Sequence, residues 1–233
     1  MLKHLQKIII TLALCMGTVW AGDVEDGNAA ILKNDYVTAL KKYKIAAAKN
    51  DAFAQIQIGN IYNAGLGVKQ DYAEAMRWYK LAAAQGYEVA QSLLGNMYYS
   101  GGGVVQDYAE AMRWYKLVAA QGNATAQYNL GDMYNNGQGV VQDYVEAVRW
   151  YKLAAAQGDV DAQRSLGIMY ESGKGVVQDY TRAHIWFNLA AVKGDSDAVK
   201  YRDISAKQMT LQQVLEAQKL ARECQARDFK NCD

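Results

Sequence analysis

Residues 107–122 read DYAEAMRWYKLVAAQG, and this stretch is repeated along the chain. Near-copies are DYAEAMRWYKLAAAQG at 71–86 and DYVEAVRWYKLAAAQG at 143–158. Looser copies begin at Asp35 and Asp179, so five copies start 36 residues apart. A fixed period of about 20–50 residues is typical of repeat proteins, in which each short unit stacks only on its neighbours. The sequence therefore predicts a solenoid.

The quoted stretch has the pattern of an amphipathic helix. Asp107 is a good N-cap, Glu110 would complete a capping box with it, and Gly122 ends the helix at the C′ position. Between these signals the apolar residues recur every three to four positions, which predicts one buried face. The residues on this face are Tyr108, Ala111, Met112, Tyr115 and Ala119.

Every unit also contains another predicted helix, which precedes the quoted one. We call the preceding helix the first helix of the unit and the quoted one the second helix. Residues 126–134 read AQYNLGDMY, with parallels at 54–62, 90–98 and 162–170. Gly131 in its middle should cost about 1 kcal/mol relative to alanine. Because the glycine recurs in four units, we expect a tyrosine or tryptophan of the neighbouring second helix to pack there. The two helices are joined by Gly-rich loops, which lack the GK[ST] signature and the preceding strand of a phosphate-binding loop.

The period defines the domain organisation. Residues 52–195 contain four units, and residues 22–51 are expected to form N-terminal capping helices. Residues 196–233 are expected to form C-terminal capping helices and a tail, with Thr210 as the N-cap of the last helix. The four units are 52–87, 88–123, 124–159 and 160–195.

Residues 1–21 have the pattern of a secretory signal peptide. Lys3 and Lys7 precede an apolar run, and Ala21 offers a cleavage site. The run is shorter than the roughly 20 residues of a transmembrane helix, although an uncleaved anchor remains the alternative. Cleavage changes the formal charge from 25 − 24 = +1 to 23 − 24 = −1. A near-neutral chain without a basic stripe argues against a nucleic-acid partner. The predicted location is periplasmic or secreted.

Two cysteines remain after cleavage, Cys224 and Cys232. In an oxidising compartment, two cysteines eight residues apart at the end of a helix predict one local disulfide. The alternative is a pair of free thiols.

The combined unit A-Q-x-x-L-G-x-M-Y-x-x-G-x-G-V-x-Q-D-Y-x-E-A-x-R-W-Y-K-x-A-A-x-Q-G resembles the Sel1-like repeat (SLR), a relative of the tetratricopeptide repeat. The resemblance covers about residues 52–195. The family often has proline where this chain has Lys69, Val105, Val141 or Val177, and this chain lacks the repeat cysteines of some secreted members. The resemblance implies an all-α, right-handed superhelical solenoid of antiparallel helix pairs. It also implies a protein-binding adaptor of the bacterial envelope.

By the same resemblance, the first helices of the units line the concave side of the superhelix. Positions opposite their buried stripe vary between units, as a recognition surface on a repeated frame would, and Ile56 and Ile168 also occupy such positions. The alternative is that these residues are merely solvated. The predicted partner-binding residues are Asn60, Asn63, Ser92, Asn96, Tyr99, Tyr128, Asp132, Asn135, Arg164 and Glu171.

The residues do not indicate an enzyme. His184, the one histidine after residue 21, replaces Met76 and Met112 of the parallel copies and therefore lies at a packing position. No Ser-x-x-Lys of a penicillin-type enzyme and no metal-ligand spacing is present, so no cofactor or metal is predicted. The predicted partner is a protein or peptide bound by a monomer, with no nucleic acid and no membrane span in the mature chain. Peptidoglycan or another glycan is the alternative ligand, because tyrosines and asparagines also suit sugars.

Overall fold

The computed structural model describes residues 21–229 and Cys232, and all regular elements in this part of the chain are helices. The predicted signal peptide lies outside the described residues, except for Ala21. No helix within them is both long and apolar enough to cross a bilayer. The helices are α2 (Ala21–Leu32), α3 (Tyr36–Ala47), α4 (Ala52–Ala64), α5 (Tyr72–Ala84), α6 (Glu88–Ser100), α7 (Tyr108–Ala120), α8 (Ala124–Asn136), α9 (Tyr144–Ala155), α10 (Val160–Ser172), α11 (Tyr180–Val192), α12 (Ser196–Ala206) and α13 (Leu211–Ala226).

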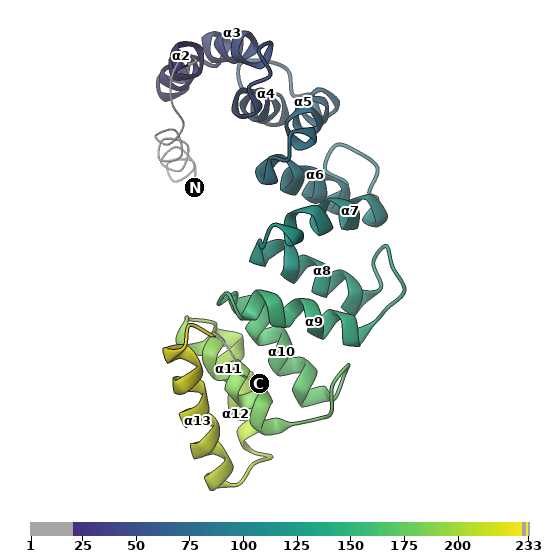
Figure 1. The fold of residues 1–233 in the computed structure, drawn as a ribbon, viewed down its shortest axis with the longest axis vertical. Coiled ribbons are helices and arrows are strands. Elements are labelled where there is room, and N and C mark those ends of the chain that lie inside the picture. Colours follow the sequence, from purple (N-terminus) through teal and green to yellow (C-terminus); the bar gives the residue numbers. More distant parts are fainter. Residues whose placement is uncertain (1–20, 230–231, 233) are drawn as a thin grey trace. The chain divides into compact units, whose positions relative to one another are not determined.

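The helices form two compact units, which divide between Gln106 and Asp107. From here on, first unit and second unit mean these two, and each 36-residue copy is called a repeat. In the first unit, α2 packs on α3 and α4 on α5, and α3 and α5 also contact the first helix of the next pair. In the second unit, α8 pairs with α9 and α10 with α11, with the same contact between successive pairs (Figure 1). This confirms the predicted all-α solenoid of helix pairs.

The second helices begin at aspartate N-caps, as predicted. The Asp107 side chain accepts a hydrogen bond from the Glu110 backbone at 3.0 Å, and Asp71 accepts one from Glu74 at 2.9 Å. The glutamates, however, do not complete the expected capping boxes. Their carboxylates pair instead with the arginine three residues later, as Glu110 does with Arg113 at 2.6 Å. Among the described helices, the reciprocal pair of bonds forms at Thr210, the cap of α13.

The glycine in the middle of α4, α8 and α10 receives a ring from the second helix of its pair, which confirms the predicted close approach in these three repeats. A Cβ atom at Gly131 would lie 2.6 Å from the Tyr151 ring. The same contact joins Gly27 of α2 to Tyr43 of α3. Helices α2 and α3 therefore pack in the same way as the helix pairs of the later repeats, although the sequence of α2 lacks the motif of their first helices.

A glutamine side chain closes the loop between the two helices of each repeat. Each first helix ends at a glycine in the left-handed conformation, such as Gly137 with φ of 69°. The amide of Gln142 then donates to the Asn135 carbonyl at 2.7 Å, which provides a partner for one of the last carbonyls of α8. The equivalent bonds are Gln70 to Asn63, Gln106 to Tyr99 and Gln178 to Glu171.

The last helix folds back onto α11 (Figure 1). Leu189 of α11 is 2 % exposed, whereas Leu153, 36 residues earlier, is 43 % exposed. Ala217 and Ala221 of α13 belong to the same buried cluster as Leu189. Cys224, at the end of α13, forms a disulfide with Cys232, with their Cα atoms 5.1 Å apart.

Candidate functional site

In the first unit, the predicted partner-binding residues lie on α4 and α6. Asn96 is exposed and the others are partly buried. Ile56, which shares the helical position of Ser92, is 6 % exposed and belongs to the core, so the expectation that it faces a ligand is wrong. The Asn60 side chain accepts a hydrogen bond from the Tyr79 hydroxyl at 2.8 Å. Asn60 therefore has a structural role within its own helix pair.

In the second unit, the predicted residues divide between α8 and α10. Arg164 of α10 forms ion pairs with Asp161 and with Asp195, the N-cap of α12. Glu171 accepts a hydrogen bond from Ser205 of α12 at 2.8 Å. These two residues hold α12 in place. Tyr128, Asp132 and Asn135 of α8 are all partly buried.

The tyrosine that covers the helix glycine is matched by a polar residue on the first helix. Tyr43 donates to Asn28 at 2.7 Å, in the same way as Tyr79 donates to Asn60. The equivalent residues of the α8–α9 pair are Tyr151 and Asp132, whose side chains are close enough for each to influence the pKa of the other. In the last pair both partners are apolar, since Phe187 replaces the tyrosine and Ile168 replaces the acceptor. This paired exchange is visible in the aligned repeats and could have been found from the sequence.

Tyr128 and Asp132 are neighbours on one face of α8, because residues four apart in a helix lie one above the other. The Tyr128 ring centroid lies 5.9 Å from that of Tyr151. Burial, together with the charge of Asp132, raises the pKa of the Tyr128 hydroxyl to about 12. Burial also raises the pKa of the Asp132 carboxyl, which hydrogen bonds from Asn136 and Tyr151 partly offset. The pair thus combines an aromatic ring with a poorly solvated carboxylate.

The recurring tryptophans pack against the helices. The Trp78 indole nitrogen donates to Glu74 at 2.8 Å, and the indole nitrogens of Trp114, Trp150 and Trp186 are buried without a hydrogen-bond partner. The indole nitrogens are therefore either hydrogen bonded within the chain or buried, and are not presented to a ligand. His184 is 2 % exposed, as its packing position predicted.

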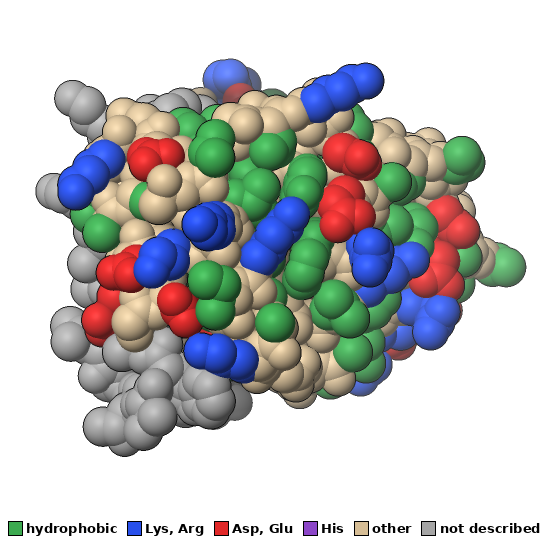
Figure 2. All heavy atoms as spheres, turned by 90° about the horizontal axis from the view of Figure 1, so that it is seen from above, with side chains coloured by type: hydrophobic (Ala, Val, Ile, Leu, Met, Phe, Trp, Pro, Cys, Tyr) green, Lys and Arg blue, Asp and Glu red, His purple; other side chains and the backbone are tan. Residues whose placement is uncertain are grey.

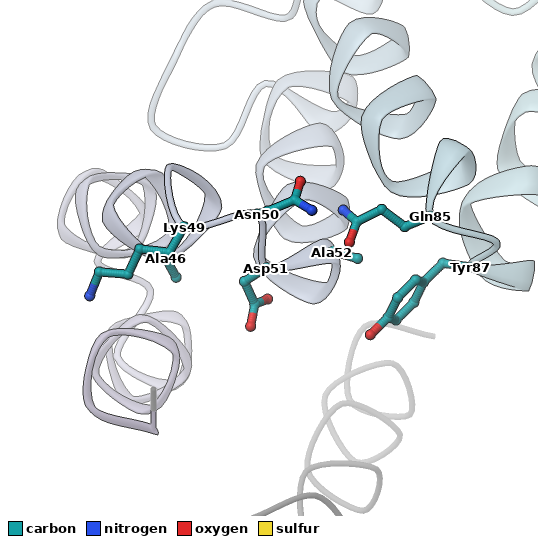
Figure 3. A pocket seen from close by; sticks show the side chains of 7 residues that line it. All are labelled: Ala46, Lys49, Asn50, Asp51, Ala52, Gln85 and Tyr87. Carbon is teal, nitrogen blue, oxygen red and sulfur yellow. The ribbon is translucent and has the colours of Figure 1, made fainter. Parts of the chain in front are cut away.

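A shallow pocket of about 250 Å³ opens in the first unit, where α3 ends and α4 begins (Figure 3). Its lining includes Asp51, which caps α4, and Gln85, which donates to Gln55 at 2.9 Å. None of the predicted partner-binding residues lines it. The pocket is therefore not part of the predicted binding site.

Figure 2 shows basic and acidic side chains interspersed on the visible face, with apolar side chains between them.

These features define an all-α repeat solenoid that presents variable polar residues on constant packing. The Sel1 repeat family matches residues 52–87, 89–123, 124–159 and 160–195, the ranges predicted from the period except that the second begins one residue later. The chain belongs to the Sel1 repeat family. Sel1 repeat proteins generally mediate protein–protein interaction.

Solved structures of this family resemble the chain. A protective antigen of uropathogenic Escherichia coli strains with an SLR fold is 43 % identical, with a TM-score of 0.65 over 68 % of this chain and 34 % of the antigen. The chain thus spans about a third of that protein. A Sel1 repeat protein of Oxalobacter formigenes is 31 % identical, with a TM-score of 0.67 over 80 % of this chain and 85 % of that one. The comparison with curated proteins gives no match.

Proposed function

We propose that the chain is a scaffold of the bacterial envelope that binds a partner protein on the first-helix face of each compact unit, which is formed by the predicted residues on α4 and α6 in the first unit and on α8 and α10 in the second. One observation carries the proposal. The core positions are nearly constant from one repeat to the next, whereas the exposed and partly exposed residues of the first helices change between repeats. In the second unit Arg164 and Glu171 are engaged by α12, so Tyr128, Asp132 and Asn135 of α8 are the residues of this face that α12 does not engage.

Site-specific photo-crosslinking in the native envelope tests the proposal. A photoreactive phenylalanine analogue is placed at Tyr128 or at Asn135. The matched control places it at Arg113 of α7, whose side chain is 75 % exposed. We expect one discrete protein adduct from both positions on α8 and none from Arg113. Adducts of equal yield from all three positions would contradict the assignment of the face.

Export to the envelope is supported by the basic and apolar pattern of residues 1–21. Mass spectrometry of the protein isolated from cells should find a mature N-terminus at Gly22. A full-length N-terminus would contradict cleavage.

Sedimentation with purified cell-wall sacculi separates the protein-binding proposal from glycan binding. We expect the mature protein to stay in the supernatant, whereas co-sedimentation would favour a glycan ligand.

A further inference from the structure

Asp132 carries a charge at a position where the other repeats use a neutral side chain. The residues 36 positions away on either side are Asn96 and Ile168, and the one before these is Asn60. An asparagine suffices for the internal contact, since Asn60 accepts from Tyr79 at 2.8 Å and Asn28 accepts from Tyr43 at 2.7 Å. The proximity of Tyr151 therefore does not explain why position 132 holds a carboxylate.

The structure gives this carboxylate no cation. Among the ion pairs of the described residues, none includes Asp132. The basic residue on the neighbouring first helix, Arg164, is engaged by Asp161 and Asp195. A partly buried charge without a counter-ion is unfavourable, and its contribution to the isolated protein is destabilising. A residue that lowers stability in this way is explained most simply by a ligand that compensates it.

The neighbours of Asp132 define the ligand. Tyr128 lies one turn earlier on α8 and presents a partly exposed ring. A carboxylate beside an aromatic ring matches a guanidinium or ammonium group, through a charge-assisted hydrogen bond and a cation–π contact.

We propose that Asp132 and Tyr128 bind a cationic side chain, preferably arginine, on an exposed segment of the partner protein. This inference rests on the proposed function and names the chemistry of the partner at one point of the first-helix face. Arginine is preferred over lysine because its planar fork pairs with a carboxylate and stacks on a ring at the same time.

The test uses two peptide probes of nearly the same shape, acetyl-Gly-Arg-Gly amide and its citrulline analogue, in which an uncharged ureido group replaces the guanidinium. Both are titrated into the ¹⁵N-labelled mature protein, and the backbone amide shifts of Tyr128 and Asp132 are followed. We expect saturable shifts with the arginine peptide and at least tenfold weaker binding of the citrulline peptide. Equal binding of the two peptides, or no shift with either, would overturn the proposal.

Asp132→Asn is the decisive variant, because asparagine keeps the shape of the side chain and one acceptor oxygen and removes the charge. We expect at least tenfold weaker binding of the arginine peptide, with a thermal midpoint equal to or above that of the wild type. Asp197→Asn of α12 removes a carboxylate elsewhere in the second unit and should leave binding within twofold. If Asp132→Asn fails to fold, Tyr128→Leu, which removes the aromatic ring, should weaken the arginine peptide at least threefold. Unchanged affinity in the variant tested would refute the site.

The photo-crosslinking experiment separates this inference from the proposed function. If Asp132→Asn gives the same adduct at Tyr128 with unchanged yield, the cation site is wrong while the first-helix face stands. If the adduct is lost in Asp132→Asn and retained in Asp197→Asn, both conclusions are supported.

Discussion

At the scale of single residues, the glycine in the first helix is where the repeat is least tolerant of change. The Tyr151 ring lies on Gly131 and is 2 % exposed, so it has little room to retreat from an added methyl group. Gly131→Ala gains about 1 kcal/mol of helix propensity but overpacks a close contact at a cost of about 1–3 kcal/mol. We expect a net loss in the free energy of unfolding, measured by urea titration.

Thr125→Ala is the matched control, since Thr125 lies on the same helix and is exposed. Its effect should stay within about 0.5 kcal/mol. A stabilised Gly131→Ala variant would show that the Tyr151 ring can shift, and that the glycine is not required for packing.

His184 should make the protein sensitive to acid. Burial and Arg202 lower the pKa of its imidazole below the ordinary value, and Asp203 opposes them. The folded protein therefore holds the neutral form, while the unfolded chain takes up a proton below about pH 6.5. Stability is thus fully present above that pH and falls as the pH drops, by at most about 1.4 kcal/mol per pH unit.

Urea denaturation between pH 7.5 and pH 5 measures this slope. His184→Met introduces the residue found at the parallel positions 76 and 112 and should flatten the slope. Parallel curves for the wild type and His184→Met would assign the pH dependence to other groups.

At the scale of elements, the loop between the two helices of a repeat is stabilised by its glutamine side chain. The Gln142 amide is bonded to the last turn of α8 at 2.7 Å. Gln142→Ala should lower the free energy of unfolding by about 0.5–1.5 kcal/mol, the usual net worth of one hydrogen bond. Val141→Ala, at an adjacent residue that is 85 % exposed, serves as the control and should change little. Equal stabilities of the two variants would contradict the role of the glutamine.

The end of α13 offers a chemical test. The disulfide between Cys224 and Cys232 closes a short loop, and the chain-entropy account assigns about 2–3 kcal/mol to a loop of this size. Non-reducing peptide mapping of the exported protein should find the two cysteines linked, and reduction should lower its thermal midpoint. Two alkylatable thiols in the oxidised protein would contradict the disulfide.

The periodicity of the sequence predicted the elements well, because each cap and each buried stripe is a local signal. Contacts between elements were harder to predict. Gly27 lies outside the motif of the later repeats, so its contact with Tyr43 was not expected. Asp132 was expected to face a ligand, and its proximity to Tyr151 became visible only when the helices were placed together. The docking of α13 on α11 also carries no motif.

At the scale of the whole molecule, a solenoid must cover its last apolar face. In this chain α13 covers α11, and the sequence of α11 is adapted to it. Ile185 is 4 % exposed and stands where α5, α7 and α9 carry the exposed arginines Arg77, Arg113 and Arg149. An arginine at this position suits a helix that faces water, whereas an isoleucine suits one that is covered.

Truncation after Met209 should therefore uncover Ile185 and Leu189 of α11. Because burial of each such side chain is worth about 1.5–3 kcal/mol, we expect the free energy of unfolding to fall by about 3–6 kcal/mol. The exposed patch should also cause self-association, visible as early elution in size-exclusion chromatography. Adding Ile185→Arg to the truncated chain recreates the surface of α9 and should restore monomeric elution without restoring all of the stability. If the truncated chain elutes and melts like the full chain, α13 is not the cover of the solenoid.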